Sequence, residues 1–314
     1  MLSRHNIHKM LSNSKTWKLP ESVIIFGCGY VGTALAKTLL QSGVRVGGLT
    51  RNAEKAAQLK SLGLSEVLIA DLSDTAWHTK LSGNYVAIVN CVSSAGGGLE
   101  GYRKSYVEGQ QSILKWAHDR TIQSYLYTGS TSVYPQDGGV DVDETADTAA
   151  APPTGQVLCE SERLLRDAAD QFAAWYVLRL AGIYGPGRHY LLDLIRSGES
   201  VIAGSGDFYL NVIHCDDIVS AICTVLMQPQ PELSGIYNVT DNQPATKAEM
   251  VTWLANKLGR PAPLFDPTQI SSRLQRRGGR MPSRRILNRK FCTTFDWKPQ
   301  YPDFRSGYNV LLNK

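Results

Sequence analysis

The sequence predicts an α/β protein with a parallel, doubly wound sheet, and two kinds of observation lead to this fold class. The apolar run Val23–Phe26 is rich in β-branched residues and ends in the pattern Gly-x-Gly-x-x-Gly over 27–32. Apolar residues then recur at helical spacing over 33–40, and a second strand is expected at 44–49. Strand and helix patterns continue to alternate to about residue 183, which is typical of parallel sheets with crossover helices.

Each glycine of the first turn has its own physical role. Gly27 allows a tight turn off the strand, and Gly29 lets the backbone approach a pyrophosphate that a Cβ would push away. Gly32 lets the new helix lie close to the sheet. The N-terminus of this helix, which includes Tyr30 and Val31, offers N–H groups to phosphates. Because a strand precedes the turn and a helix follows it, we predict a dinucleotide site here. The alternative is a plain turn whose glycines serve packing.

The end of the second expected strand predicts which dinucleotide is bound. An acidic residue about 20 positions beyond the glycine pattern would bind the ribose 2′-hydroxyl of NAD. Here the positions are Thr50, Arg51 and Asn52, and a guanidinium with two short polar groups suits a 2′-phosphate. We therefore expect NADP(H) to be preferred over NAD(H). The alternative is that Arg51 is a solvated loop residue.

Later strand ends supply the other residues of the predicted cofactor site. We expect strands at 66–70, 85–92, 124–128 and 175–183, with helices at about 102–118 and 155–172. A glycine-rich loop over 93–98 has the flexibility to pass over a cofactor, although its glycines equally suit a plain turn. The residues assigned to the cofactor site from this part of the chain are Asp71, Leu72, Val92, Ser93, Thr128, Leu180, Gly182 and Ile183.

The chain beyond residue 184 is less regular. Short helices are expected at 191–197, 218–227 and 247–258, the second capped by Asp216 and Asp217, and short strands at 201–203, 211–213 and 235–239. The stretch 135–153 is expected to be a long surface loop. We divide the chain into a poorly ordered basic extension (1–20), a dinucleotide-binding domain (21–184) and a smaller substrate lobe (185–314). One or two elements of that lobe are expected to return to the sheet.

Composition narrows the class of protein. With 43% apolar and 19% charged residues the chain is of ordinary globular type, and no apolar run approaches the roughly 18 residues that cross a bilayer. The six cysteines contain no C-x-x-C pair, which favours reduced thiols in a cytoplasmic protein over disulfides or a metal site. The basic first twenty residues lack the apolar segment of a signal peptide, and a transit peptide is the alternative to a native extension.

Several motifs together make the sequence similar to a known family. They are Gly27–Gly32, Ser130–Tyr134, Arg179–Gly187, Asn211–Asp217 and Tyr237–Val239. From residue 21 onward the chain resembles the extended short-chain dehydrogenase/reductase family, the NAD(P)-dependent nucleotide-sugar epimerases and dehydratases. The resemblance implies a Rossmann-type fold and hydride transfer to or from a hydroxyl or carbonyl group. It is also compatible with a homodimer, which is common among such proteins.

The same resemblance implies which residues would carry the chemistry. In the family a Ser or Thr orients the substrate hydroxyl, a Tyr is the general acid/base, and a Lys four residues later lowers the pKa of that Tyr. Ser130 matches the first position, whereas Thr154 and Leu158 stand where the Tyr and the Lys belong. The pKa of a Thr hydroxyl is too high for a base near pH 7, and Leu158 supplies no charge. The chain therefore resembles an atypical branch of the family.

Another group must then handle the proton if hydride chemistry takes place. Our candidates are Tyr106, which stands at the position of the family's helix Asn, and His189, with a structural role as the alternative for each. Ser130 also has an alternative role, as a cap for the turn after its strand. The other ring-bearing residues near the expected pocket are assigned to packing: Tyr134, Tyr184 and His214.

A basic segment near the C-terminus is the second feature with a functional interpretation. It contains Arg273, Arg276, Arg277, Arg280, Arg284, Arg285, Arg289 and Lys290. Guanidinium groups bind oxyanions bidentately, so a clamp for a phosphate or carboxylate of the substrate is one interpretation. The lack of interleaved aromatic residues disfavours a nucleic-acid surface, and a solvated loop is the remaining interpretation.

Together these patterns predict an NADP(H)-dependent oxidoreductase that acts on an anionic, nucleotide-sugar-like small molecule. The competing hypothesis, since the Tyr and Lys are absent, is a protein that binds NADP(H) without turnover, as a sensor or a scaffold. A nucleic-acid-associated protein is the third hypothesis. No membrane association is expected.

Overall fold

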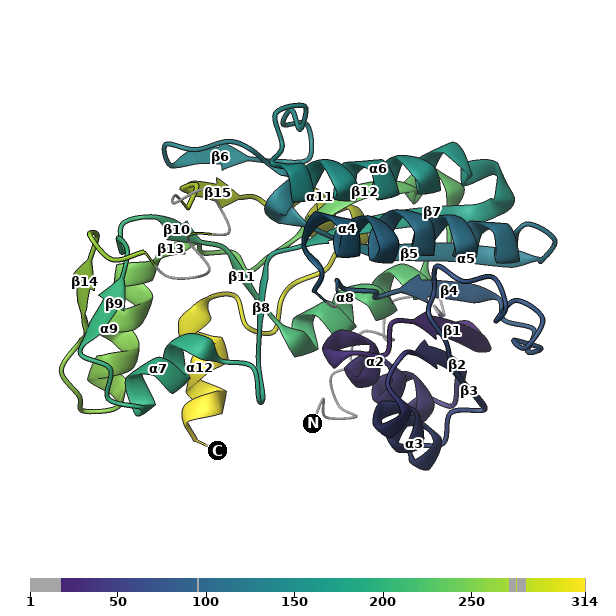
Figure 1. The fold of residues 1–314 in the computed structure, drawn as a ribbon, viewed down its shortest axis with the longest axis horizontal. Coiled ribbons are helices and arrows are strands. Elements are labelled where there is room, and N and C mark those ends of the chain that lie inside the picture. Colours follow the sequence, from purple (N-terminus) through teal and green to yellow (C-terminus); the bar gives the residue numbers. More distant parts are fainter. Residues whose placement is uncertain (1–17, 95, 271–274, 276–280, 314) are drawn as a thin grey trace. The chain divides into compact units, whose positions relative to one another are not determined.

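One central sheet organises the first part of the chain. The computed structural model describes residues 18–94, 96–270, 275 and 281–313. The sheet has seven strands in the order β12-β7-β5-β4-β1-β2-β3 (Figure 1). Their bounds are β1 Ser22–Phe26, β2 Arg45–Thr50, β3 Glu66–Ile69, β4 Ala87–Asn90, β5 Ile122–Ser130, β7 Phe172–Leu180 and β12 Gly235–Val239.

Strand β1 pairs in parallel on both of its sides. Ile25 lies opposite Gly48 of β2 and opposite Val89 of β4. The pairs β2–β3 and β4–β5 are parallel as well. The order of the strands therefore reverses between β1 and β4, and open parallel sheets bind ligands at such a point, outside the carboxyl ends of the strands. The predicted α/β class with a doubly wound parallel sheet is confirmed.

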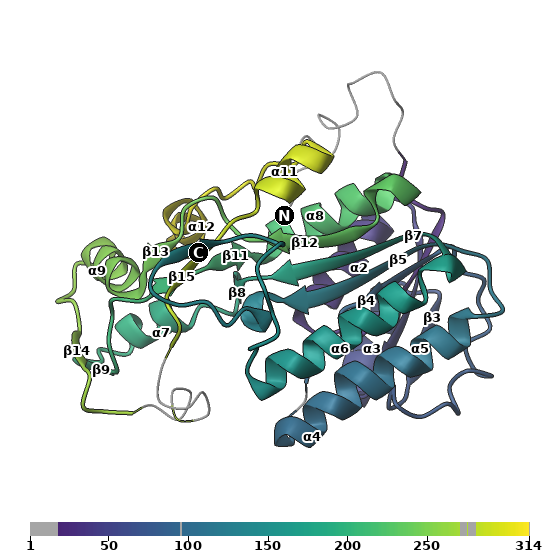
Figure 2. The ribbon, with the colours of Figure 1, turned by 90° about the horizontal axis from the view of Figure 1, so that it is seen from above.

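Helices cover both faces of this sheet. In Figure 2, α5 and α6 lie on the near side of the strands, and α2 and α8 lie on the far side. α2 begins directly after the glycine turn and buries Val31, Leu35 and Leu39, the spacing from which the helix is predicted. The bounds are α2 Tyr30–Gln41, α3 Ala53–Ser61, α4 Gly98–Tyr102, the π-helical turn η1 Arg103–Glu108, α5 Gly109–Ala117, the short turn η2 Thr131–Val133, α6 Pro153–Asp167, the short turns η3 Ala169–Gln171 and η4 Pro231–Leu233, and α8 Cys215–Met227.

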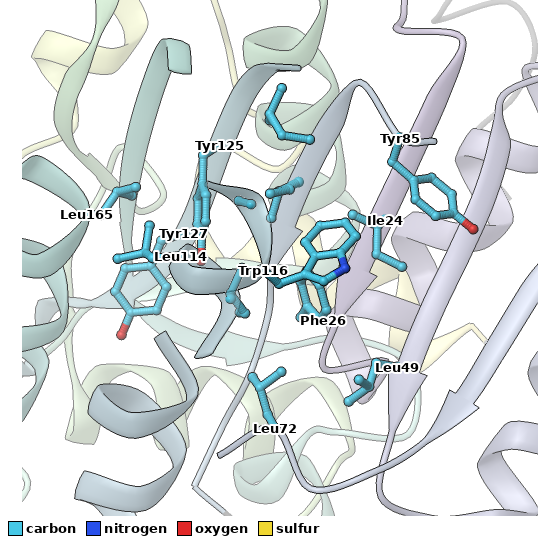
Figure 3. Packing of buried hydrophobic residues seen from close by; sticks show 14 of the residues in the cluster. Ile24, Phe26, Leu49, Leu72, Tyr85, Leu114, Trp116, Tyr125, Tyr127 and Leu165 are labelled. Carbon is cyan, nitrogen blue, oxygen red and sulfur yellow. The ribbon is translucent and has the colours of Figure 1, made fainter. Parts of the chain in front are cut away.

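An aromatic cluster lies between the sheet and α5. The ring of Phe26 packs against Trp77 and Trp116, with ring centroids 5.2 and 5.7 Å apart. Figure 3 shows Phe26 and Trp116 in contact, and the buried Tyr125 ring lies on β5, which β4 separates from β1. The family that the sequence resembles usually has the pattern Gly-x-x-Gly-x-x-Gly, and Phe26 stands at the position of its first glycine. Here the residue fills the core beneath the turn instead.

A buried ion pair joins α6 to β7. The Arg179 guanidinium donates to both oxygens of the Glu162 carboxylate, at 2.9 and 2.6 Å. Arg179 is 5% exposed and Glu162 is 3% exposed, so water solvates neither charge and each charge is stabilised by the other. Gly129 of β5 lies against the pair, where a Cβ would come 3.2 Å from the carboxylate.

We predict that Glu162→Ala lowers the free energy of unfolding by about 3–5 kcal/mol, because it leaves a buried guanidinium without its carboxylate. Urea unfolding measures the change. Glu160→Ala is the matched control on the same helix, since Glu160 pairs with the exposed Arg103 at 2.8 Å and its loss should cost far less. Equal losses in the two variants would contradict the assignment.

The described chain forms two compact units that interleave in sequence. The first contains the chain up to Val133, Ala151–Arg179 and Ile218–Tyr237, and the second contains Tyr134–Ala150, Leu180–Asp217 and the chain from Asn238 onward. The single division that we expected at residue 184 differs from this arrangement. The segment that includes most of α8 and β12 returns to the first unit, and an early loop segment belongs to the second.

The second unit is built from short strand pairs and helices. Its elements are β6 Val140–Val142, β8 Gly182–Tyr184, α7 Tyr190–Arg196, β9 Val201–Ala203, β10 Tyr209–Leu210, β11 Val212–His214, β13 Ala245–Thr246, α9 Lys247–Lys257, β14 Leu264–Asp266, β15 Arg284–Ile286, α11 Arg289–Phe295 and α12 Phe304–Leu312. Tyr184 is buried and stacks on Tyr308 with ring centroids 4.9 Å apart. Gly307 of α12 permits this contact, because a Cβ there would overlap the Tyr184 hydroxyl.

The expected surface loop over 135–153 contains a strand. β6 lies within it and pairs in parallel with β15, and the Asp141 carboxylate lies 2.6 Å from the guanidinium of Arg285. The two strands are more than a hundred residues apart in the sequence, so the local composition of the loop gives no sign of the pairing.

Two further element boundaries correct the prediction. α8 begins at Cys215, so Asp216 and Asp217 lie in its first turn and do not cap a helix that starts at 218. The Asp217 carboxylate accepts instead from the backbone amides of Gln300 and Tyr301, at 2.6 and 3.1 Å.

The strand expected at 175–183 divides into β7 and β8, because β8 pairs with β11 of the second unit.

Within the part of the chain that the structure describes, no helix has both the length and the apolar character needed to cross a bilayer.

Candidate functional site

A cavity of about 400 Å³ lies at the carboxyl ends of β1, β2, β3 and β4. Parallel strands bring these ends to one edge of the sheet, so residues far apart in the sequence become its walls. The lining consists of Gly27, Cys28, Gly29, Leu49, Thr50, Arg51, Asn52, Asp71, Leu72, Cys91, Val92, Ser93 and Ser105. Nine of them are residues that the sequence assigns to the cofactor site.

A larger groove of about 1290 Å³ lies at the amino ends of the strands, lined among others by Glu21, Arg45 and Gln123. Ligands of open parallel sheets bind at the carboxyl ends. The smaller cavity is therefore the candidate site.

The turn between β1 and α2 is tightly packed except beside Gly29. Gly27 has a φ of +86°, and a Cβ on it would lie 2.6 Å from the Val92 amide nitrogen. A Cβ on Gly32 would lie 2.5 Å from the Gly27 carbonyl oxygen. A Cβ on Gly29 would meet nothing within 4 Å, and Gly29 lines the cavity. This free space at a helix start that has no side-chain cap fits a pyrophosphate.

The wall after β2 is polar and carries a cation. The Asn52 side chain caps α3 by accepting from the Lys55 amide at 2.8 Å, and Thr50 Oγ1 accepts from the Asn52 amide at 3.3 Å. Arg51 is exposed between these two residues and lines the cavity. An anionic group at this wall would meet the guanidinium and no carboxylate from the end of β2.

The wall after β3 contributes a carboxylate that already has partners. Asp71 accepts from the amide and the hydroxyl of Ser73 at 3.2 and 3.1 Å, and Lys104 Nζ lies 2.9 Å from its other oxygen. Partial burial alone would raise the pKa of Asp71, but the hydrogen bonds from Lys104 and Ser73 bring it below its ordinary value. Asp71 is therefore ionised, and Lys104 balances its charge.

Seven residues of the predicted cofactor site do not line the cavity: Tyr30, Val31, Gly32, Thr128, Leu180, Gly182 and Ile183. Val31 and Gly32 are buried in the first turn of α2. Thr128 donates to the Asn90 carbonyl at 3.1 Å and so joins β5 to β4. The last three belong to the second unit, two of them in β8. A direct role for these seven in cofactor binding stays a prediction.

The cavity also includes residues that the sequence analysis missed: Cys28, Leu49, Cys91 and Ser105. Leu49 and Cys91 lie at the carboxyl ends of β2 and β4, so the rule that ligands bind there could have found them. Ser105 comes from η1, for which the apolar pattern gives no signal. Burial raises the pKa of the Cys28 thiol to about 12, so this thiol is not a nucleophile near neutral pH.

The end of β5 and the start of α6 bring Ser130 and Thr154 into one region. Ser130 Oγ accepts from the amide and the hydroxyl of Ser132 at 3.2 and 2.9 Å, so it does cap the following turn. Its own hydroxyl proton stays available for donation. A Cβ on Gly155, the neighbour of Thr154, would lie 3.0 Å from the Ser132 carbonyl oxygen. The catalytic roles of Ser130 and Thr154 stay predictions.

Tyr106 and His189 belong to different units. Tyr106 Oη accepts from the Ser94 amide at 3.2 Å, and burial raises the pKa of Tyr106 to about 12. His189 Nδ1 lies 2.8 Å from a carboxylate oxygen of Asp193 in α7. Proton transfer by either residue stays a prediction.

The residues assigned to packing are held by neighbours within the second unit. Tyr134 Oη donates to Asn238 Oδ1 at 2.8 Å, and His214, which is buried, accepts at Nδ1 from the Asp216 amide at 3.2 Å. Among the residues described, no group of His, Cys, Asp and Glu is arranged to hold a metal ion.

The C-terminal basic segment is partly structural. Arg284 is buried and donates to the Gln136 carbonyl at 3.3 Å, and Arg285 pairs with Asp141. These two residues therefore belong to β15 and not to a solvated loop. Arg289 and Lys290 are exposed at the start of α11. The remaining members lie outside the described residues: Arg273, Arg276, Arg277 and Arg280.

Comparison with known proteins agrees with this geometry. The family model described as NAD dependent epimerase/dehydratase family matches residues 23–240. Protein YeeZ of Escherichia coli K12 is 29% identical over 292 residues, which cover 90% of this chain and 97% of that protein. A 3-diazoavenalumate denitrifying reductase from a Streptomyces species is 26% identical over 325 residues, which cover 91% of this chain and 98% of the reductase.

The fold is also that of a solved epimerase. The UDP-glucuronic acid 4-epimerase of Bacillus cereus, in complex with UDP-glucuronic acid and NAD, matches with a TM-score of 0.77 at 17% identity. The match covers 93% of this chain and 98% of the epimerase. The family match over 23–240 includes the glycine turn and every residue that lines the cavity. This chain belongs to the NAD-dependent epimerase/dehydratase family.

Proposed function

We propose that the chain is an oxidoreductase that prefers NADP(H) to NAD(H) and acts on a hydroxyl or carbonyl group of an anionic, nucleotide-sugar-like molecule. One observation carries the proposal: the cavity at the carboxyl ends of β1 to β4 has free space beside Gly29 and a guanidinium, Arg51, at its β2 wall. The Bacillus cereus epimerase, solved with UDP-glucuronic acid, supports the substrate class. The Streptomyces relative, named a reductase, supports the reaction class.

The residues of the cavity fit a dinucleotide. The space beside Gly29 would hold the pyrophosphate, because a Cβ on that residue would fill it. Arg51 and the neighbouring polar groups would hold the adenosine ribose and its 2′-phosphate. When bound, the nicotinamide ring accepts or supplies a hydride.

In this proposal Ser130 orients the substrate. Its Oγ accepts two hydrogen bonds from Ser132, so its own proton is the one that it donates to a substrate oxygen. The Thr154 hydroxyl supplies a second donor from the start of α6. Neither hydroxyl is a strong base, so reduction of a carbonyl, whose oxygen needs a donor, suits these residues better than epimerisation, which needs a base.

The second candidate function is a sensor or scaffold that binds NADP(H) without turnover. The buried Leu158 favours it, because an apolar side chain at that position cannot lower the pKa of a neighbouring hydroxyl. Consumption of NADPH that depends on a nucleotide sugar or another anionic carbonyl compound supports the oxidoreductase. Saturable binding of NADPH without turnover on such a panel supports the sensor.

The proposed setting is the cytoplasm, with a homodimer as the proposed assembly. All six cysteines are free thiols, the state that a reducing compartment maintains. The homodimer draws on the family resemblance alone.

The glycine turn gives a paired prediction. Gly29→Ala should leave the free energy of unfolding within about 1 kcal/mol of the original, because its Cβ enters free space. The same variant should weaken NADPH binding at least about tenfold, since the methyl group takes the place of a phosphate oxygen. Gly32→Ala should instead lower stability, because its Cβ meets the Gly27 carbonyl. Calorimetry and urea unfolding measure the two quantities, and unchanged NADPH affinity in Gly29→Ala would refute the assignment.

Cofactor choice depends on Arg51 in this proposal. Arg51→Ala should weaken NADPH binding about ten- to a hundredfold, the loss of one charge-assisted phosphate contact, and change NADH affinity by less than about threefold. Lys55→Ala, in the first turn of α3, is the control for general loss of positive charge. Titrations with both cofactors test the claim, which fails if the unchanged protein binds NADH more tightly than NADPH.

Substrate orientation depends on the Ser130 hydroxyl. Ser130→Ala should lower kcat/KM about a hundredfold, as expected when one donor to the reacting oxygen is removed, and leave NADPH affinity unchanged. Ser132→Ala tests the turn itself, because it removes one donor to Ser130 but no group that contacts substrate. Full activity in Ser130→Ala would remove Ser130 from the mechanism.

A further inference from the structure

One helix of the first unit holds the loop after β4 at three points. α4, η1 and α5 form a single continuous helix over 98–117 (Figure 2). The loop after β4 supplies Cys91, Val92 and Ser93 to the lining of the cavity. The helix contacts Ser94 and Gly96 of this loop directly, and it holds Val92 indirectly through Asn90, the last residue of β4.

The first two points are hydrogen bonds. Asn90 Nδ2 donates to Gln110 Oε1 of α5 at 2.7 Å, and Asn90 Oδ1 in turn accepts from the Val92 amide at 3.1 Å. One turn earlier on the helix, Tyr106 Oη accepts from the Ser94 amide at 3.2 Å. Gln110 is fully buried and Tyr106 is largely buried, so water does not readily replace these acceptors.

The third point is a close backbone contact. α4 begins directly after this loop, and its first hydrogen bond runs from the Gly101 amide to the carbonyl of its N-cap residue, Gly97, at 3.0 Å. A Cβ on Gly101 would overlap the carbonyl oxygen of Gly96, so only glycine lets the loop lie this close to α4.

The π-helical turn brings these contacts to one face of the helix. Gly101, Tyr106 and Gln110 are five and four residues apart. In an α-helix, at about 100° per residue, Gly101 would be turned about 180° away from Gln110. η1 lies between Gly101 and Gln110, and its i to i+5 hydrogen bonds turn the chain by less per residue than an α-helix, which reduces the angle between these two residues. The same turn carries Ser105, which lines the cavity, and Lys104, which pairs with Asp71.

We propose that this helix fixes the loop that forms one wall of the dinucleotide cavity, with Tyr106 as a positioning residue and not as a proton carrier. The inference rests on the proposed function, since it assigns to the cavity a dinucleotide. It goes beyond that function because it identifies what holds the wall in place. The π-helical turn is then a requirement of the binding site.

Tyr106→Phe tests the proposal, because it removes only the acceptor of the Ser94 amide. The Kd for NADPH should rise about fivefold, as expected for one lost hydrogen bond. The peptide that contains Ser94 should exchange its amide hydrogens faster, and the pH profile of turnover should keep its shape. Tyr102→Phe is the matched control, since its ring lies 5.2 Å from that of Tyr106 and the change leaves the Ser94 contact in place. It should bind NADPH with the original Kd.

Gly101→Ala is the second variant. Alanine normally stabilises a helix interior relative to glycine. Here we expect the opposite, a lower Tm, because the new Cβ overlaps the Gly96 carbonyl oxygen. We also expect a higher Kd for NADPH than in Tyr106→Phe. The proposal is overturned if Tyr106→Phe matches the original protein in both Kd and exchange at Ser94, or if it removes one limb of the pH profile. If the original protein binds no dinucleotide, the proposed function fails instead. Hydrogen exchange in the free chain then still decides whether Tyr106 holds the loop.

Discussion

The packing of the first turn sets the geometry of the whole site. The backbone at Gly27 lies against Val92, and Gly32 lies against the Gly27 carbonyl, so both positions exclude a side chain. These contacts fix the start of α2 relative to β1 and to the loop after β4. Beside Gly29 alone the turn leaves space, and that space belongs to the cavity. A ligand that needs bare backbone amides therefore has one place to approach.

The charged groups around the cavity suit a ligand that itself supplies the reactive group, such as a redox cofactor. Lys104 balances the charge of Asp71, and the exposed Arg51 guanidinium lines the cavity. The Cys28 thiol and the Tyr106 phenol both have their pKa raised to about 12 by burial. A raised pKa disfavours the ionised form of both side chains near neutral pH, which is the form that acts as a nucleophile or base. The described part of the site thus offers shape, positive charge and hydroxyl donors, and the redox chemistry of the family comes from its cofactor.

Local patterns were enough to predict the sheet, the glycine turn and the wall after β2. Each of these depends on residues close together in the sequence: a strand, a turn and a helix start within about ten positions, or Arg51 directly after β2. The pairing of β6 with β15 could not be predicted in this way, because Asp141 and Arg285 meet only in the folded chain. The early start of α8 was missed because the Asp217 carboxylate bonds to the amide of Tyr301 and not to its own helix.

The π-helical turn explains why Ser105 was also missed. An apolar pattern of period 3.6 fits the helix on either side of η1, but it gives no sign of the change of spacing within η1.

The central claim, that the space beside Gly29 accepts the pyrophosphate of a pyridine dinucleotide, is tested most directly by calorimetric titration of the purified chain with NADPH and with NADH. The account predicts saturable binding of both to one site, with NADPH the tighter. Absence of heat of binding for either cofactor would contradict it.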